Sequence, residues 1–262
     1  MQTDRLRAML EAFGLKHTSK HLTALLDAAE TEEQPHRQFL MAALEVEVSG
    51  RNERRRSRNY ALAHFPPSVR PIDEFDPAEL ESGITPSQIK QLKDLSWLDA
   101  CGNIILAGPP GLGKTMVALG LGLHAVNEGY TVCYEKMGDF FDILAKAEVE
   151  RSAGFRLKNI RKAQLVILDE IGYATITREQ ANRFFCFISD AYEKRSVIFT
   201  TNKEIPEWVE MMGDPVLTAA MMDRILHHAR CFSLKGESYR LKHPELFVGG
   251  KASGKTALVY HV

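Results

Sequence analysis

GPPGLGKT, residues 108–115, is the stretch of this chain that indicates most about its fold. An apolar run at 103–107 precedes it, and a helix-like run at 116–126 follows it. A phosphate-binding loop requires this strand, loop and helix context. The glycines let backbone N–H groups turn inward around a phosphate chain, Lys114 adds a positive charge, and the Thr115 hydroxyl can ligate Mg²⁺. The stretch therefore predicts a nucleoside triphosphate site. Its expected residues are Gly108, Pro109, Pro110, Gly111, Leu112, Gly113, Lys114 and Thr115.

The same spacing occurs again in GGKASGKT, residues 249–256. Only six residues follow this second copy, too few for the helix whose N-terminal dipole completes an anion site. The preceding HPELFV is a poor strand sequence. We therefore expect 249–262 to be a flexible tail, so spacing alone does not identify the site.

Composition excludes several classes of protein. Lys and Arg number 33 against 34 Asp and Glu, a net charge of −1, so nucleic acid could bind only through a local patch. No apolar run approaches the ~18 residues of a membrane span, and the N-terminus lacks the apolar core of a secretory signal. We expect a cytoplasmic, nucleoid-associated protein with no membrane partner. Its four single cysteines are expected to be buried reduced thiols.

Residues 1–65 predict a small all-helical domain, because apolar residues recur there at helical spacing without a strand signal. It closes on RNERRRSR, residues 51–58, which holds five arginines. One face of a continuing helix would carry four of them. That face is either a solvated surface paired with Glu47 and Glu53 or a contact to nucleic-acid phosphates, which the clustering favours. The four arginines are Arg51, Arg54, Arg55 and Arg58.

A proline-rich stretch at 66–86 predicts a linker to a domain at 87–248. In that domain continuous apolar runs alternate with longer helical ones, which indicates an α/β fold with a parallel sheet covered by helices on both faces. Ligands of such sheets bind at the carboxyl ends of the strands. The expected strands are NIILA at 103–107, TVCYE at 131–135, LVIL at 165–168, SVIFTT at 196–201 and RCFSL at 230–234.

Polar residues follow two of these strands. Asp169 after LVIL suits Mg²⁺ ligation, and Glu170 is placed to orient or deprotonate an attacking water. Asn202, at the end of FTTN, either hydrogen-bonds the γ-phosphate or the water, or simply forms a strand-to-turn exit. His227 and His228 are adjacent, so on a helix they would not share a face, and we do not expect them to bind metal.

The ensemble of motifs resembles the IstB-like transposition helper ATPases, relatives of the DnaC helicase loaders within the AAA+ superfamily. The resemblance runs from about Leu92 to Lys242, and the arginine-rich helical N-terminus is also similar. Two departures, Ala191 before Tyr-Glu and Met116 after GKT, do not touch the phosphate or Mg²⁺ positions. The motifs are GPPGLGKT, LVILDEIGY at 165–173, TTN at 200–202, GDPVLTAAMMDRILHHA at 213–229 and GESYRLK at 236–242.

This resemblance implies an AAA+ P-loop NTPase fold and roles that spacing does not show. Asn202 is like sensor 1, Arg224 is like an arginine finger that reaches an adjacent subunit's nucleotide, and Arg240 is like sensor 2. An arginine that acts in trans makes hydrolysis depend on a homo-oligomer. The catalytic residues it implies are Lys114, Asp169, Glu170, Asn202, Arg224 and Arg240, with Thr115 and Asp169 as metal ligands.

The expected function is that of an ATP- and Mg²⁺-dependent helper of DNA transposition. ATP binding would assemble subunits on duplex DNA, and the assembly would remodel the DNA and recruit or activate a partner transposase. A DnaC-like replicative helicase loader, which would prefer single-stranded DNA, is one alternative. A P-loop small-molecule kinase, which needs neither DNA nor an arginine in trans, is the other.

Overall fold

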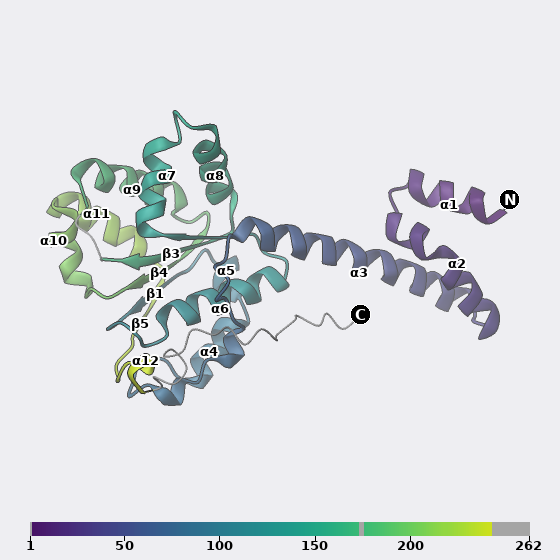
Figure 1. Ribbon diagram of the computed structural model, residues 1–262, viewed down its shortest axis with the longest axis horizontal. Coiled ribbons are helices and arrows are strands. Elements are labelled where there is room, and N and C mark those ends of the chain that lie inside the picture. Colours follow the sequence, from purple (N-terminus) through teal and green to yellow (C-terminus); the bar gives the residue numbers. More distant parts are fainter. Residues whose placement is uncertain (1, 173–175, 243–262) are drawn as a thin grey trace.

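A five-stranded parallel sheet organises the computed structural model, which describes residues 2–172 and 176–242 (Figure 1). The strand order is β2-β3-β4-β1-β5, so the strand before the phosphate-binding loop lies between β4 and β5. All five expected strands are present, with ends that differ by at most three residues. They are β1 (Asn103–Ala107), β2 (Val132–Lys136), β3 (Leu165–Ile171), β4 (Ser196–Thr201) and β5 (Ala229–Ser233).

Helices cover both faces of the sheet, as the continuous apolar strands predict. One face packs under α7 (Met137–Lys146), α8 (Arg151–Lys162), α9 (Arg178–Ala191), α10 (Trp208–Met212) and α11 (Pro215–Leu226), and the other under α4 (Pro86–Lys93), α5 (Ser96–Asp99) and α6 (Lys114–Asn127). Ile105 points into the first core, whereas its neighbours Ile104 and Leu106 point into the second. Short turns of helix complete the fold: η1 (Ile72–Glu74), η2 (Pro77–Glu79), η3 (Ile205–Glu207) and α12 (Tyr239–Lys242).

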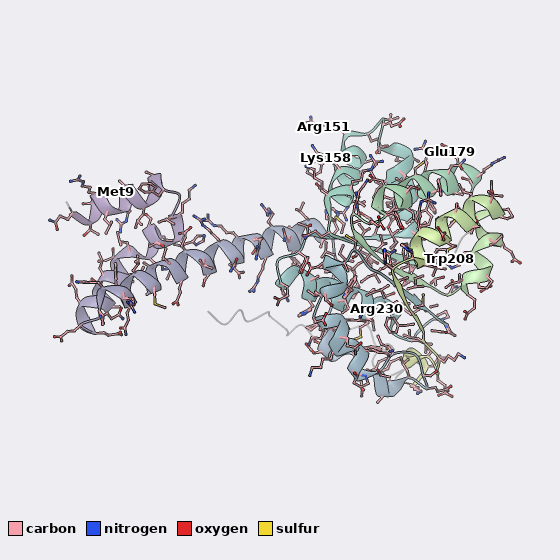
Figure 2. The ribbon with its side chains drawn as sticks, turned by 180° about the vertical axis from the view of Figure 1, so that it is seen from behind. Met9, Arg151, Lys158, Glu179, Trp208 and Arg230 are labelled. Carbon is pink, nitrogen blue, oxygen red and sulfur yellow. The ribbon has the colours of Figure 1, made fainter. Side chains whose placement is uncertain are left out.

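The N-terminal region is helical throughout and comprises α1 (Gln2–Ala12), α2 (Lys16–Thr31) and α3 (His36–Ala63). The 28-residue α3 begins beside α2 and runs as one continuous helix to the part of the chain that forms the sheet (Figure 1). Seen from behind, Met9 on α1 lies far from Trp208 in the sheet's core (Figure 2). The arginine-rich segment 51–58 lies within α3, in its second half.

Glu47 on α3 fixes the start of α2. Glu47 is 3% exposed, and its carboxylate accepts hydrogen bonds from the backbone N–H groups of His17, at 2.8 Å, and Thr18, at 3.1 Å. Helix N-termini leave such groups unpaired, so the carboxylate caps the helix. Arg51 pairs with the same carboxylate at 2.8 Å.

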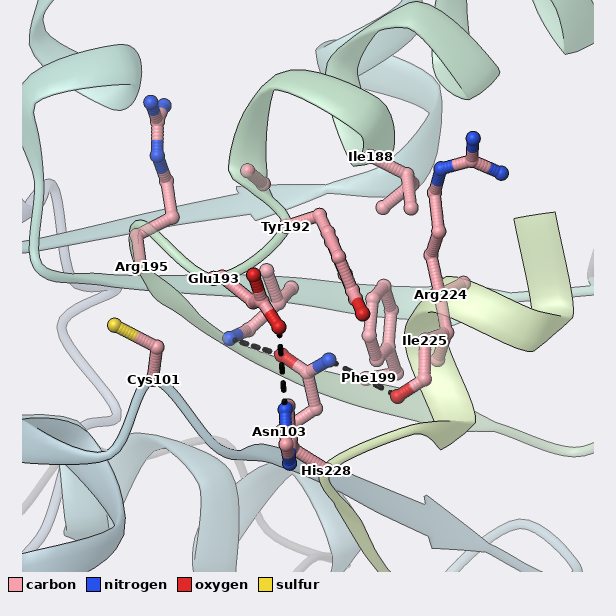
Figure 3. Close-up of a pocket in the computed structure, with 12 residues that line it drawn as sticks. Cys101, Asn103, Ile188, Tyr192, Glu193, Arg195, Phe199, Arg224, Ile225 and His228 are labelled. Atoms are coloured by element: carbon pink, nitrogen blue, oxygen red, sulfur yellow. Dashed lines mark hydrogen bonds and ion pairs between the residues drawn. The ribbon is translucent and has the colours of Figure 1, made fainter.

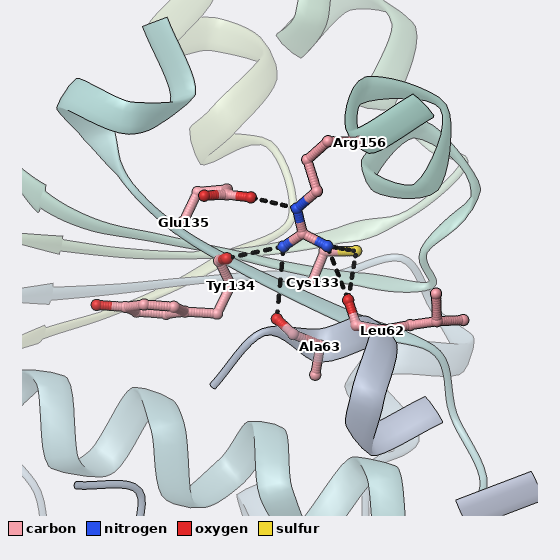
Figure 4. A network of polar contacts seen from close by, with 6 residues as sticks. All are labelled: Leu62, Ala63, Cys133, Tyr134, Glu135 and Arg156. Carbon is pink, nitrogen blue, oxygen red and sulfur yellow. Dashed lines mark hydrogen bonds and ion pairs between the residues drawn. The ribbon is translucent and has the colours of Figure 1, made fainter. Parts of the chain in front are cut away.

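The end of α3 is joined to the sheet by a buried arginine (Figure 4). Arg156 on α8 donates to the carbonyl oxygens of Leu62, at 2.7 Å, and Ala63, at 3.5 Å. These are among the last carbonyls of α3, which have no partner within the helix. The same guanidinium forms an ion pair with Glu135 on β2, and both side chains are buried. Burial raises the pKa of Glu135, although Arg156 opposes this effect.

Segment 66–86, expected as a linker, packs against the helix that follows the phosphate-binding loop: Ile72 in η1 is buried and lies against Gly120 of α6. The expectation of buried cysteines is correct only for Cys133. Cys186 is exposed because it lies on the outer face of α9, and Cys231 is exposed because it lies on the edge strand β5. Cys101 is half-buried.

In the described parts of the chain, no helix is long and apolar enough to cross a bilayer.

Candidate functional site

The loop 108–115 connects β1 to α6, with its glycines in conformations that other residues rarely adopt. Gly108 has φ 143°, and a Cβ there would lie 2.3 Å from the carbonyl oxygen of Leu234. Gly111 has φ 86°, and a Cβ there would lie 2.0 Å from the Ser238 hydroxyl. The loop therefore needs glycine at both positions, for its backbone turn and for the close approach of segment 234–238.

Lys114 lies in the first turn of α6, with its ammonium folded over the loop. Its Nζ donates hydrogen bonds of 2.7 Å to the carbonyl oxygens of Gly108 and Pro109. Burial lowers the pKa of Lys114, and the nearby Asp169 carboxylate partly opposes this effect. The positive charge is thus held at the loop, where phosphate oxygens would compete with its two carbonyl partners.

Asp169 lies at the centre of the polar cluster and is 1% exposed. Its Oδ1 accepts a 2.9 Å hydrogen bond from the Thr115 hydroxyl and a second, shorter one from the Thr200 hydroxyl. Its Oδ2 accepts a 3.0 Å hydrogen bond from the phenol of Tyr134. Both oxygens of the carboxylate are therefore oriented by neutral donors. These donors come from α6, β4 and β2.

Tyr134 and Thr200 hold this carboxylate but were not predicted from the sequence. Burial, followed by the Asp169 charge, raises the pKa of Tyr134, so its phenol remains a hydrogen-bond donor at neutral pH. The parallel pairing of β2 with β3 brings the tyrosine to the aspartate. That pairing depends on strand order, and the sequence alone presents Tyr134 only as one member of an apolar strand.

Glu170 turns away from the sheet because its backbone is left-handed, with φ 64°. The pairing of β3 with β4 shifts register between Leu168 and Ile171, and the Glu170 N–H donates a 3.0 Å hydrogen bond to the Thr200 hydroxyl. Its side chain is partly exposed and forms a 2.9 Å ion pair with Lys136 of β2. The bulge thus directs two successive carboxylates to different surroundings, as their expected roles require.

Asn202 follows β4 and faces Gly172, which follows β3. Its Oδ1 lies 2.9 Å from the position that a Cβ on Gly172 would occupy. This oxygen is buried without a hydrogen-bond partner in the described residues. A buried amide oxygen without a partner is costly, so its position beside the acidic pair fits a polar group of a bound ligand.

The residues present fit MgATP. Thr115 and Asp169 offer hard oxygen atoms 2.9 Å apart, the donor type that Mg²⁺ prefers. Lys114 and the loop N–H groups offer positive charge and donors to a phosphate chain. The unpartnered amide oxygen of Asn202 lies at the same end of the sheet. This end of the sheet is therefore the candidate site for ATP.

The two predicted arginines lie in different places. Arg224 of α11 lines a pocket beside Asn103, at the amino end of β1, so it lies away from the loop that follows β1's carboxyl end (Figure 3). Its guanidinium donates to Ala220 O at 2.7 Å and lies 5.1 Å from the Phe185 ring centroid. The side chain of Arg240 lies outside the described residues. The backbone beside it contacts the loop, since Tyr239 N donates to Gly111 O at 3.0 Å.

The four-arginine face of α3 divides into two pairs. Arg51 is engaged by Glu47 and by Gly14 O, and Arg55 lies against Gly129 in the turn before β2. Arg54 and Arg58 are exposed, and no other residue within 2–172 or 176–242 forms a hydrogen bond or ion pair with them. The second phosphate-loop pattern, 249–256, lies outside the described residues.

The fold and the site together define the class of this protein. A parallel sheet in the order 2-3-4-1-5, with a phosphate-binding loop after β1 and an acidic pair at the end of β3, is an ATP-binding domain of the AAA+ type. The chain belongs to the family of IstB-like ATP binding proteins, which matches residues 8–246. It is thus an ATP-binding protein of the kind that insertion sequences carry.

Relatives in that family align over most of their length. The ATP-binding protein of insertion sequence IS21 from Pseudomonas aeruginosa is 38% identical over 237 residues, covering 90% of this chain and 89% of its own. Its counterpart in IS5376 from Geobacillus stearothermophilus is 33% identical and covers 93% of this chain and 96% of its own.

Two solved structures share the fold. DnaI aligns with a TM-score of 0.55 and 16% identity over 66% of this chain and 95% of its own. The DnaC helicase loader aligns with a TM-score of 0.51 and 16% identity over 63% of this chain and 96% of its own. At such low identity these likenesses show the fold alone.

Proposed function

We propose that this protein hydrolyses ATP and uses the reaction to control its assembly on duplex DNA during transposition. The observation that carries the proposal is the convergence of Thr115, Asp169 and Glu170 at the carboxyl ends of the sheet strands, beside the loop. Membership in a family that insertion sequences carry supports the link to transposition. We further propose that the protein acts in the cytoplasm on the nucleoid.

In the proposed reaction, Lys114 and the loop N–H groups hold the phosphate chain, while Thr115 and Asp169 hold Mg²⁺. The ion would neutralise charge on the β- and γ-phosphates. Glu170 accepts a proton from the attacking water once its carboxylate leaves Lys136, and Asn202 orients that water. Water oxygen bonds to the γ-phosphorus as the bond to the ADP oxygen breaks, which yields ADP and phosphate.

A neighbouring subunit would complete this site. Arg224 lies at the opposite end of the sheet from its own phosphate loop, so it can stabilise the transition state only at a nucleotide bound by another copy. Arg240 is proposed to contact nucleotide bound to its own subunit, because its backbone lies next to Tyr239, which bonds to the loop. Hydrolysis would then report on assembly.

DNA is proposed to bind along α3. Arg54 and Arg58 offer exposed charges for phosphate contacts, which carry little sequence information. The helical N-terminal domain at 1–65 would also help subunits to associate. The resulting assembly would present remodelled duplex DNA to a partner transposase, which performs the strand chemistry.

Duplex DNA should stimulate ATP hydrolysis by the full-length chain. The test compares phosphate release without DNA, with duplex DNA and with single-stranded DNA of equal nucleotide content. Stimulation by duplex DNA alone supports the proposal. Preferential stimulation by single-stranded DNA would favour a helicase loader, and a rate that DNA does not change would contradict both functions.

A further inference from the structure

A cluster of metal-ligating side chains lies at the amino ends of the strands, whereas the proposed ATP site lies at their carboxyl ends. Its members are Glu193, His227 and His228. Each offers one ligand atom, and the three atoms lie within 4.8 Å of one another. Figure 3 shows Glu193 above His228, with the carboxylate directed toward the imidazole.

The end of α11 makes the cluster possible. If both histidines lay within a helix, their side chains would point in different directions. The helix ends at Leu226, however, so the two residues lie in the turn before β5, and their ring centroids are only 4.1 Å apart. The two histidines therefore can point toward the same ion.

Glu193 reaches the histidines from the turn between α9 and β4. Its backbone is left-handed, with φ 55°, a conformation that non-glycine residues rarely adopt. Its Oε1 lies 3.7 Å from Nε2 of His228, which is too long for a hydrogen bond. Two ligands on one tetrahedral Zn²⁺ are ~3.4 Å apart, so only a small movement of exposed side chains is needed.

Asn103 connects the turn that carries the histidines to the start of β4, the strand that follows Glu193. Its side chain accepts a 2.9 Å hydrogen bond from Val197 N and donates one of 3.0 Å to Ile225 O. Its backbone N–H donates to His228 O at 3.0 Å. One residue thus holds the turn of the histidines and the strand that follows Glu193, which reduces the cost of arranging the ligands around an ion.

Tyr192 contacts one ring nitrogen of His227, as hydrogen-bond partners of metal-bound histidines usually do. Its hydroxyl lies 2.8 Å from Nδ1 of His227, which leaves Nε2 of that ring for an ion. Partners of this kind set the tautomer and the ring orientation of a ligand. The arrangement therefore resembles a prepared His-His-Glu site with an open coordination position.

We propose that Glu193, His227 and His228 bind one divalent transition-metal ion, with Zn²⁺ the preferred occupant. Imidazole and carboxylate ligands in tetrahedral geometry suit Zn²⁺, whereas Mg²⁺ favours oxygen donors alone. The ion would link the turn after α9 to the end of α11, the helix that carries Arg224.

The test is titration of the full-length, tag-free chain, without nucleotide, with Zn²⁺ by calorimetry and with Co²⁺ by visible absorption. We expect one ion per chain with the ligand-field bands of tetrahedral Co²⁺. His228→Ala and Glu193→Gln should each abolish stoichiometric binding, and Tyr192→Phe should weaken it ~10-fold. His21→Ala, which alters an exposed histidine of α2, should bind as the unaltered chain does.

Circular dichroism shows whether each variant is folded, and thermal unfolding gives a second measurement. Zn²⁺ should raise the melting temperature of the unaltered chain but not that of folded His228→Ala. The proposal is overturned if the unaltered chain binds no metal, or if the folded His228→Ala variant retains unaltered affinity. Loss of binding in His21→Ala would place the ion in the N-terminal helices and would also overturn it.

Discussion

The phenol of Tyr134 donates a 3.0 Å hydrogen bond to Oδ2 of Asp169. Because Thr115 and Thr200 both donate to Oδ1, the tyrosine is the donor that sets the direction of the second oxygen. Burial and the Asp169 charge raise its pKa, so the hydrogen bond persists throughout the neutral range. We infer that Tyr134 positions the carboxylate for Mg²⁺.

Tyr134→Phe should raise the Mg²⁺ concentration needed for half-maximal ATPase activity by ~10-fold, since a hydrogen bond to a charged group contributes ~1.5 kcal/mol. ATP binding without Mg²⁺ should not change. The matched control is Tyr130→Phe, which removes a phenol bonded to Asp99 at the surface. An unchanged Mg²⁺ dependence in Tyr134→Phe would show that the hydrogen bond has no role in orienting the carboxylate.

Arg224→Ala should reduce ATP turnover by ~10³-fold and leave ATP binding intact, because the guanidinium acts on a neighbour's transition state. Lys114→Ala should lose ATP binding. Mixing the two inactive variants should restore part of the activity, since some interfaces then pair an intact loop with an intact Arg224. Rates of phosphate release test this, and normal turnover in Arg224→Ala, or no recovery on mixing, would place Arg224 outside the site.

Replacing Arg54 and Arg58 with glutamine should weaken duplex DNA binding for all sequences alike. The slope of log affinity against log salt should fall by ~2, because each lost phosphate contact removes ~0.9. Fluorescence anisotropy over a salt series measures both quantities. Arg37→Gln is the control, since Arg37 is exposed on the same helix but outside the cluster. Equal effects of the two changes would mean that the cluster is an ordinary solvated surface.

Arg156→Met should destabilise the sheet and the helices packed on it by ~3–5 kcal/mol, because it leaves the Glu135 carboxylate buried without its partner. The double variant with Glu135→Gln should recover much of this loss, since no unpaired charge then remains. Urea unfolding gives the free energies. If the double variant is no more stable than the single one, the carbonyl contacts to Leu62 and Ala63 contribute more than the ion pair does.

Acid should weaken the N-terminal helices through Glu47. Burial opposes its ionisation, but Arg51 and the N–H groups of Thr18 and His17 outweigh burial and lower its pKa below 4.5. A carboxyl with a depressed folded-state pKa stabilises the fold above its unfolded pKa, and this contribution is lost as pH falls through the folded pKa.

Thermal unfolding of Glu47→Gln should therefore depend less on pH below about 4.5 than that of the unaltered chain. At neutral pH the variant should be ~1 kcal/mol less stable, since an amide accepts these hydrogen bonds less strongly. Parallel pH profiles for the two chains would contradict the assigned role of Glu47.

Much of the fold follows from local sequence. Asn103–Ala107 and Ser196–Thr201 are strands with the predicted ends, because their apolar runs are bounded by polar or glycine residues. The parallel sheet places Asp169 beside Thr115, as expected from strand ends. The role of Tyr134 depends on sheet order, which local patterns do not encode.

The arrangement of His227 and His228 was not predictable for a different reason. It depends on the helix ending at Leu226, and helix ends are difficult to locate by one residue from sequence. Likewise, the separation of Arg51 from Arg54 and Arg58 arises from Glu47, which lies one turn earlier on the same helix. Helical spacing alone gives all four arginines the same face.

Sedimentation of the full-length chain with duplex DNA tests ATP-controlled assembly on DNA most directly. We predict that ATP with Mg²⁺ produces a fast-sedimenting complex containing several subunits per DNA, that ADP releases it, and that Glu170→Gln holds it in the assembled state. Sedimentation as a single subunit with ATP and duplex DNA present would contradict ATP-controlled assembly on DNA.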